Sequence, residues 1–205
     1  MPLYKTLKPN KNTTVLVWKI EEDLSVLQAI YTNKNSQKRI DGMRSEIHKK
    51  GFLSVRHLLA KMDYTDDDLF YTDDGKPHLK DGKRISITHS FEFSAIIISN
   101  QVIGIDIEKN REKIIRIANK FIGKEADFIT KKNQIEQLTV IWGAKESLYK
   151  IHPDGGLLFK HHLPIEKFKL SDKKTRGWIK KDNFYEVFDI YFEQLDGFTL
   201  VFALN

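Results

Sequence analysis

The chain has 205 residues, of which 40% are hydrophobic, and a formal net charge of +6. It has no cysteine, which excludes disulfides, thiolate metal sites and a cysteine nucleophile. Its longest apolar run, Ala95 to Ile98, is far shorter than the ~18 residues of a membrane helix, and residues 1–20 do not resemble a signal peptide. We therefore expect a cytoplasmic protein that does not enter a membrane, and its basic charge favours a polyanionic partner such as a nucleotide or an acidic protein.

Turn residues and apolar spacing predict the elements of the first half of the chain. A short helix is expected near Asp23 to Tyr31, and apolar residues from Ile40 to Met62 mark one face of a long helix in which Gly51 indicates a bend. The acidic residues 63–74 and the Asp-Gly-Lys-Pro turn that follows are predicted to form a loop. Alternating or apolar runs predict strands at Thr13 to Ile20, Ile85 to Ser90, Phe93 to Ser99 and Val102 to Glu108.

The second half is predicted to contain helices followed by strands. Helical spacing is found at Lys113 to Phe121, Glu125 to Lys131 and Gln134 to Lys150, the last being the most regular. Alternation predicts strands at Trp178 to Lys180, Tyr185 to Glu193 and Phe198 to Ala203. The chain is therefore expected to be one compact α+β unit.

The strand Val102 to Glu108 carries two acidic residues on one face. Because side chains alternate along a strand, Gly104, Asp106 and Glu108 point to the same side. Carboxylates at i and i+2 lie close enough to share a hard cation such as Mg²⁺, and Gly104 allows another group to approach the backbone closely. The alternative is an exposed strand face with ordinary surface acids.

The helix Gln134 to Lys150 places Trp142, Glu146 and Lys150 on one stripe, at i, i+4 and i+8. Glu146 could supply a third carboxylate to the same metal, with Lys150 one turn further facing the phosphates that the metal binds. Metal and lysine would together neutralise charge on a transferred or leaving phosphate. The alternative is an ordinary helical ion pair between Glu146 and Lys150.

Several short motifs occur together in a characteristic order. They are VRHLL (Val55 to Leu59), GKP (Gly75 to Pro77), ISITHS (Ile85 to Ser90), GIDIE (Gly104 to Glu108), KFIGKE (Lys120 to Glu125) and WGAKESLYK (Trp142 to Lys150). In this order the chain resembles the 4′-phosphopantetheinyl transferases of the type that activates surfactin synthetase. The resemblance implies two similar α/β subdomains with small, mostly antiparallel sheets related by a pseudo-twofold. We expect them at residues 1–101, on the coenzyme A 3′-phosphate side, and 102–205, with the metal and the catalytic helix, in a monomer.

The resemblance also implies a reaction, of the holo-[acyl-carrier-protein] synthase type. A serine of an apo acyl or peptidyl carrier protein with an acidic surface would attack coenzyme A, take up 4′-phosphopantetheine and release 3′,5′-ADP. Asp106, Glu108 and Glu146 would hold Mg²⁺, and Lys150 would contact the phosphate whose charge rises. Glu146 and Lys150 would be catalytic, with Glu125 either the general base or a helix cap.

Contacts to coenzyme A are implied for residues of the first half. Lys76 and His89 would grip the 3′-phosphate with Arg56 as a helper, and Thr88 would donate its hydroxyl to the pyrophosphate. Two positions depart from the family pattern: Thr88 replaces the usual serine, and Gly143 stands where a small hydroxyl residue is common. A further basic cluster remains without individual assignments: Lys34, Lys38, Arg39 and Arg44.

Two other functions fit part of the pattern. A metal-dependent nuclease would use Asp106, Glu108, Glu146 and Lys150, but it leaves the GKP and THS motifs without a role. A non-catalytic nucleic-acid-binding module would use the basic residues from Arg39 to Lys50, but the acidic side chains would then repel phosphate. We therefore expect no nucleic-acid partner.

Overall fold

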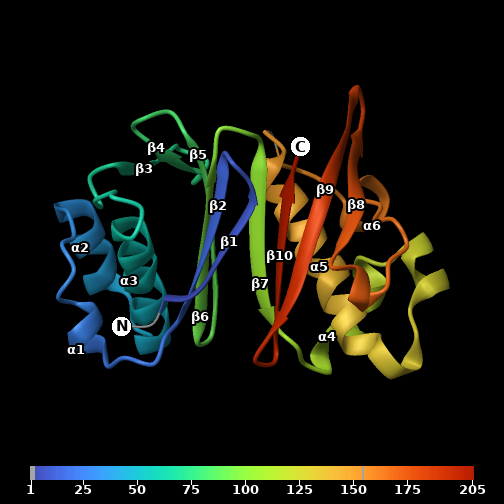
Figure 1. Ribbon diagram of the computed structural model, residues 1–205, viewed down its shortest axis with the longest axis horizontal. Helices are drawn as coiled ribbons and strands as arrows, with labels where there is room; N and C mark the ends of the chain where they lie inside the picture. Colours follow the sequence, from blue (N-terminus) through green and yellow to red (C-terminus); the bar gives the residue numbers. More distant parts are fainter. Residues whose placement is uncertain (1–2, 154) are drawn as a thin grey trace. The chain divides into compact units, whose positions relative to one another are not determined.

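The computed structural model describes residues 3–153 and 155–205, which divide into two compact units at Gln101 and Val102. Each unit contains one sheet with helices packed on it (Figure 1). The paired strands of both sheets run antiparallel, so the predicted α+β class is confirmed. Within the described ranges, no helix combines the length and apolar character needed to cross a bilayer.

The first unit is built on a six-stranded sheet of order β1-β2-β6-β5-β4-β3. Its strands are β1 (Leu3–Asn10), β2 (Thr13–Lys19), β3 (Leu69–Tyr71), β4 (Pro77–Leu79), β5 (Arg84–Ser90) and β6 (Phe93–Ser99). Strands β2, β5 and β6 lie where they were predicted. The expected loop over residues 63–77 is partly wrong, because Leu69–Tyr71 pairs with Pro77–Leu79 as a short hairpin. Strand β1 was not predicted.

Three helices accompany this sheet: α1 (Leu24–Leu27), α2 (Lys34–Gly42) and α3 (Glu46–Ala60). The single long helix expected from Ile40 is wrong, because the chain leaves the helical conformation at Met43 (φ −78°, ψ 127°). Gly51 does not bend the chain but lies inside α3. A Cβ on Gly51 would stand 3.2 Å from Cγ of His89, so the glycine makes room for that imidazole ring.

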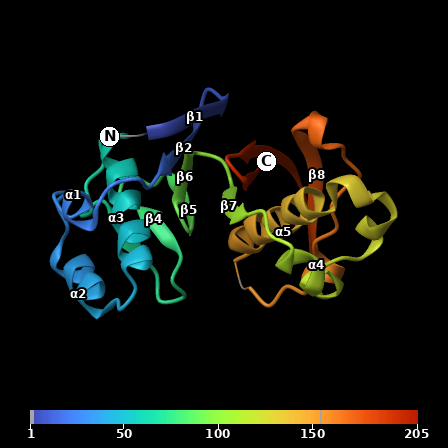
Figure 2. The same cartoon turned by 90° about the horizontal axis from the view of Figure 1, so that it is seen from below.

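The second unit has a four-stranded sheet of order β7-β10-β9-β8, in which the first strand pairs with the last. Its strands are β7 (Ile103–Lys109), β8 (Lys174–Lys181), β9 (Phe184–Leu195) and β10 (Phe198–Leu204). Helix α5 (Gln134–Ile151) lies along one face of this sheet (Figure 2). The helix expected at Glu125 to Lys131 is wrong: 3-10 turns η2 (Lys124–Phe128) and η3 (Lys131–Asn133) occupy this segment.

The remaining short helical elements of this unit are α4 (Lys113–Ile117), η1 (Ala118–Lys120), α6 (Phe159–His162) and η4 (Leu170–Asp172). Together with α5 they enclose the core of the unit. Its largest buried side chains include Phe121, which contacts the Trp142 ring edge-on at 5.1 Å between ring centroids. Trp142 also contacts the ring of Phe159, so its place on the functional stripe of α5 coincides with a packing role.

Two glycines bring α5 against the sheet. A Cβ on Gly104 would lie 2.0 Å from the backbone oxygen of Ser147, so no larger residue fits beneath the helix. The close approach predicted at Gly104 is confirmed, and the approaching group is α5 itself. A Cβ on Gly143 would lie 2.7 Å from Cγ2 of Val201, which gives the departure at Gly143 a physical reason. The tight packing places Glu146 of α5 close to Asp106 and Glu108 of β7.

Candidate active site

Acidic and basic side chains from β7 and α5 gather at one place in the second unit. Asp106 is 6% exposed and lies on the α5 side of β7. Lys150, near the end of α5, donates from Nζ to the carbonyl oxygen of Ile105 at 2.7 Å and to Oδ1 of Asp106 at 3.0 Å. Lys150 therefore ties the helix to the strand at the position of the predicted metal ligands.

The carboxylate of Glu146 interacts electrostatically with Asp106, Glu108 and Lys150. Burial, together with the negative charges of Asp106 and Glu108, raises the pKa of Glu146 to about 7, while the positive charge of Lys150 opposes this shift. Three carboxylates from a strand and a helix thus lie close enough to repel one another. A divalent cation with a preference for oxygen ligands fits such a set.

The three carboxylates do not form a closed ligand set. Within residues 3–153 and 155–205, no group of three or more His, Cys, Asp or Glu side chains has the arrangement of a metal site. Like charges repel one another, and Oδ1 of Asp106 accepts a hydrogen bond from Lys150. The Mg²⁺ site at Asp106, Glu108 and Glu146 therefore remains a prediction that rests on their proximity and chemistry.

Glu125, expected as the general base, lies in a buried ion pair. It is 2% exposed, and its Oε1 lies 2.7 Å from Nζ of Lys145 and 3.1 Å from the amide nitrogen of Ile165. Its Oε2 accepts a hydrogen bond from the amide of Gly123 at 2.8 Å. A general base must reach the proton that it removes, so this enclosed carboxylate supports a structural role instead.

Lys145, the partner of Glu125, was not among the predicted site residues. Its Nζ also donates to the carbonyl oxygens of Phe121 at 2.6 Å and Phe159 at 3.1 Å, and burial lowers the pKa of this amine. The signal was present in the sequence, because Lys145 falls at i+4 from Ile141 on the buried face of α5. A lysine at an apolar position requires a buried partner.

Arg56 is also held inside the protein, in the first unit. Its guanidinium is 2.9 Å from Oδ1 of Asp66, and the two side chains are 3% and 1% exposed. The cation stacks on the ring of Phe52 at 3.4 Å from the ring centroid. The charge and position of Arg56 are therefore engaged in this ion pair, and its contact with the donor phosphate stays an untested prediction.

The other expected donor-binding residues lie along β4 and β5. Thr88 and His89 are consecutive on β5, so they point to opposite faces of the sheet; Thr88 is buried and His89 is exposed. The ring of His89 lies beside α3, with its centroid 6.4 Å from that of His48. Lys76 directly precedes β4, and its Nζ is 3.7 Å from Oδ2 of Asp74. Because His78 pairs with Arg84 in antiparallel register, the chain at Lys76 runs toward the end of β5 that carries Thr88.

The basic cluster left without assignments is exposed. Lys34, Lys38 and Arg39 lie on α2, and Arg44 lies in the short connection to α3. The guanidinium carbon of Arg39 is 5.5 Å from the ring centroid of Tyr71. Tyr71 pairs with Pro77, the residue after Lys76, so Arg39 lies against the hairpin that contains Lys76.

Comparison with known proteins agrees with this geometry. Residues 102–201 match the model of the 4′-phosphopantetheinyl transferase superfamily. The chain is also 26% identical over 189 residues to the 4′-phosphopantetheinyl transferase gsp of Aneurinibacillus migulanus, and the match covers 85% of this chain and 77% of that protein. The matched family region contains β7 and α5, and with them all the residues of the acidic site and its lysine.

Proposed function

We propose, from the match of residues 102–201 to the 4′-phosphopantetheinyl transferase superfamily, that the chain is a member of it and transfers 4′-phosphopantetheine from coenzyme A to a serine of an apo carrier protein. The serine oxygen forms a bond to the β-phosphorus and gives up its proton to solvent, while the bond from that phosphorus to the leaving 3′,5′-ADP breaks. The observation that carries the proposal is the meeting of Asp106, Glu146 and Lys150 at the contact of β7 with α5.

Asp106, Glu108 and Glu146 are the residues that would hold Mg²⁺. When bound, the cation would neutralise negative charge on the pyrophosphate and act as a Lewis acid toward it. Lys150 keeps an ammonium group next to these carboxylates, where it can offset the charge that accumulates on the leaving phosphate. Lys145 and Glu125 hold the segments of Phe121 and Ile165 against α5, so we assign them to positioning and not to proton transfer.

Residues of the first unit are proposed to bind the adenosine end of the donor. Lys76 and His89 offer charge or hydrogen bonds to the 3′-phosphate, and Thr88 offers a hydroxyl to the pyrophosphate. We further propose that the chain acts on carriers with an acidic surface, since its net charge of +6 favours such a partner over a basic one. We also propose that it works as a monomer in the cytoplasm.

The test is to incubate the protein with coenzyme A, Mg²⁺ and an apo carrier protein and to weigh the carrier by mass spectrometry. We expect a gain equal to one phosphopantetheine arm, and no gain on a carrier whose acceptor serine is replaced by alanine. Cleavage of DNA in the same buffer without carrier modification would replace the transferase by a metal-dependent nuclease.

The donor contacts can be tested with Lys76→Ala. Losing one charge-assisted hydrogen bond to phosphate should raise KM for coenzyme A about tenfold or more, with little effect on 3′-dephospho-coenzyme A. Steady-state kinetics with the two donors measures this difference. Lys80→Ala, which removes an exposed lysine beyond β4, is the matched control and should change neither value. An equal rise in KM for both donors would show that Lys76 does not contact the 3′-phosphate.

The crowded carboxylates also predict a pH dependence of stability. The pKa of Glu146 is about 7 in the folded chain against 4.5 ordinarily, so the folded state holds this proton more tightly than the unfolded state. The contribution of Glu146 to stability is complete below its ordinary pKa and disappears as pH rises through the folded value. In EDTA, urea unfolding should therefore show a larger loss of stability between about pH 5.5 and about pH 8 for the wild type than for Glu146→Gln. Parallel pH profiles would contradict this.

A further inference from the structure

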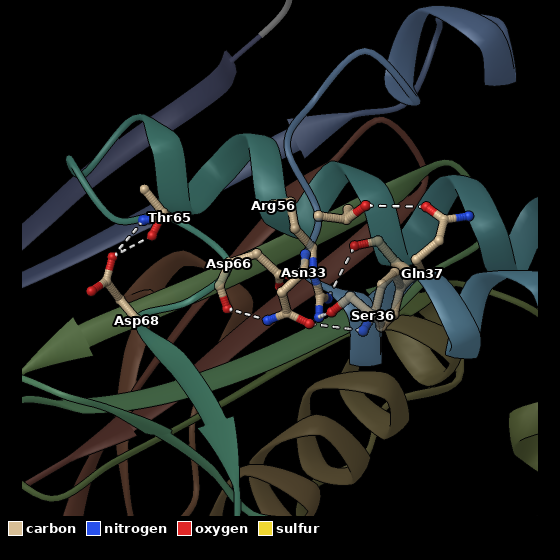
Figure 3. A network of polar contacts seen from close by, with 9 residues as sticks. Asn33, Ser36, Gln37, Arg56, Thr65, Asp66 and Asp68 are labelled. Atoms are coloured by element: carbon tan, nitrogen blue, oxygen red, sulfur yellow. Dashed lines mark hydrogen bonds and ion pairs between the residues drawn. The ribbon is translucent and has the colours of Figure 1, made fainter.

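A buried polar network surrounds the start of α2 (Figure 3). Oδ1 of Asp66 accepts a hydrogen bond from Nε of Arg56 at 2.9 Å, and Oδ2 accepts one from the backbone amide of Asn33 at 3.0 Å. The side-chain amide of Asn33 donates to the carbonyl oxygen of Asp66 at 3.0 Å. Arg56 also donates to the hydroxyl of Ser36 at 3.2 Å. One ion pair thus connects α3, the acidic loop and the first turn of α2.

Asn33 is the residue through which this network begins the helix. It is the N-cap of α2, and its Oδ1 accepts a hydrogen bond from the amide of Ser36 at 2.9 Å. The cap satisfies an amide that has no partner inside a helix. Because both ends of the Asn33 side chain and its backbone amide are engaged, the direction in which α2 leaves the loop is determined by Asp66.

Helix α2 has few other attachments. It has 9 residues, of which Ser36 and Ile40 are the buried ones. Ile40 packs with Leu27, Phe52 and Leu53, and Ser36 is already part of the polar network. Isolated helices of this length are marginal in water, so their position depends on tertiary anchors. The Arg56–Asp66 network provides the anchor at the N-terminal end, and Ile40 provides the one near the C-terminal end.

The exposed side of α2 carries Lys34, Lys38 and Arg39, and no acidic side chain until Asp41. Arg39 lies over the rings of Phe52 at 5.4 Å and Tyr71 at 5.5 Å from the ring centroids. Phe52 is also the ring on which Arg56 stacks. Tyr71 pairs with Pro77, which directly follows Lys76 in the chain. Arg39 of α2 therefore lies against the hairpin that contains Lys76, the lysine proposed for the 3′-phosphate.

We propose that Arg56, Asp66 and Asn33 are positioning residues for recognition of the donor: they hold α2 so that its cations and Lys76 meet the same phosphate group. The inference rests on the proposed transferase function and adds a dependence on residues that never touch the donor. It replaces the direct phosphate contact expected of Arg56. The affected quantity is the preference for coenzyme A over 3′-dephospho-coenzyme A, because only the former presents the extra dianionic phosphate.

The first test is Asn33→Ala, which removes the cap and one bond to Asp66 without creating a buried charge. We expect KM for coenzyme A to rise about five- to tenfold, which is the fold-change that corresponds to the free energy of one helix N-cap. The kcat and the KM for 3′-dephospho-coenzyme A should stay within about twofold of the wild-type values. The matched control is Asn35→Ala on the same helix, at an exposed position. In a chain that already lacks the charges of Lys34, Lys38 and Arg39, Asn33→Ala should add little, since the two changes act on one contact.

The second test is Asp66→Asn, with circular dichroism to confirm folding. The same loss of donor preference is expected, while Asp63→Asn, which removes an exposed charge from the same loop at a position of positive φ that asparagine accepts, should have no effect. A wild type that loads carriers from neither donor would overturn the proposed function. A wild type that prefers coenzyme A and keeps this preference in Asn33→Ala would overturn the positioning role alone. Equal losses for both donors would also overturn it, because general destabilisation does not distinguish the 3′-phosphate.

Discussion

We expect Asp106→Asn to reduce the rate of carrier loading at least about a hundredfold, which is the typical effect of removing one group that stabilises a transition state electrostatically. Asn has nearly the volume of Asp, and its carbonyl oxygen can still accept the hydrogen bond of Lys150. The substitution therefore removes the negative charge that attracts a cation while leaving the packing of α5 on β7 in place. The measurement is the initial rate of the mass shift of the carrier at saturating coenzyme A.

The control for this loss is Glu186→Ala, an exposed acid on β9 of the same unit. It changes the net charge equally and should leave the rate unchanged. If Asp106→Asn and Glu186→Ala were equally active, the carboxylate of Asp106 would have no part in the reaction. Thermal unfolding of both variants should stay close to that of the wild type, which separates lost chemistry from lost structure.

Gly104→Ala is the second change with a large expected effect, and it acts on structure first. The new Cβ would stand 2.0 Å from the backbone oxygen of Ser147, and backbone cannot yield as the end of a side chain can. Overpacking of a core lowers the free energy of unfolding by about 1–3 kcal/mol. A collision with backbone atoms should cost at least the upper value of this range, because the backbone has little room to move. We expect the free energy of unfolding in urea to fall by about 3 kcal/mol and the loading rate to fall as well. The rate falls because α5 carries Glu146 and Lys150 away from Asp106.

Two other glycines provide a graded comparison. Gly143→Ala meets the side chain of Val201 at 2.7 Å, which can move, so its cost should be smaller. Gly42→Ala meets no atom within 4 Å and lies at a negative φ, so it should be neutral or slightly stabilising. An unfolding free energy for Gly104→Ala as high as that of Gly42→Ala would show that α5 does not depend on this contact.

The parts of the fold that sequence predicted best are those with strong local patterns. Val102 to Glu108 alternates, and Gln134 to Lys150 keeps an apolar stripe, so both elements of the acidic site were found close to their observed bounds. Their meeting could be anticipated only from motifs, because the contact of Gly104 with Ser147 joins residues far apart in the chain. Strand β1 was missed because its lysines and Pro9 weaken the pattern of an edge strand.

Sequence alone could not anticipate the surroundings of residues whose environment is set by distant partners. Arg56 and Glu125 are charged and stand in motifs, which favours an exposed functional role for each. Their partners Asp66 and Lys145 make them buried ion pairs instead, and nothing local distinguishes Asp66 from the acids beside it. Gly51 was interpreted as a bend for the same reason, since the ring that occupies its space belongs to His89 on another element.

The claim on which the mechanism depends is that the carboxylates of β7 and α5 bind one divalent cation. Titration calorimetry of the metal-free protein with Mg²⁺, and with Mn²⁺ as a tighter-binding substitute, measures this without any reaction. We predict saturable binding of one ion per chain in the wild type and a clear loss of affinity in both Asp106→Asn and Glu146→Gln. Unchanged affinity in both variants, or no binding by the wild type with coenzyme A present, would contradict the account.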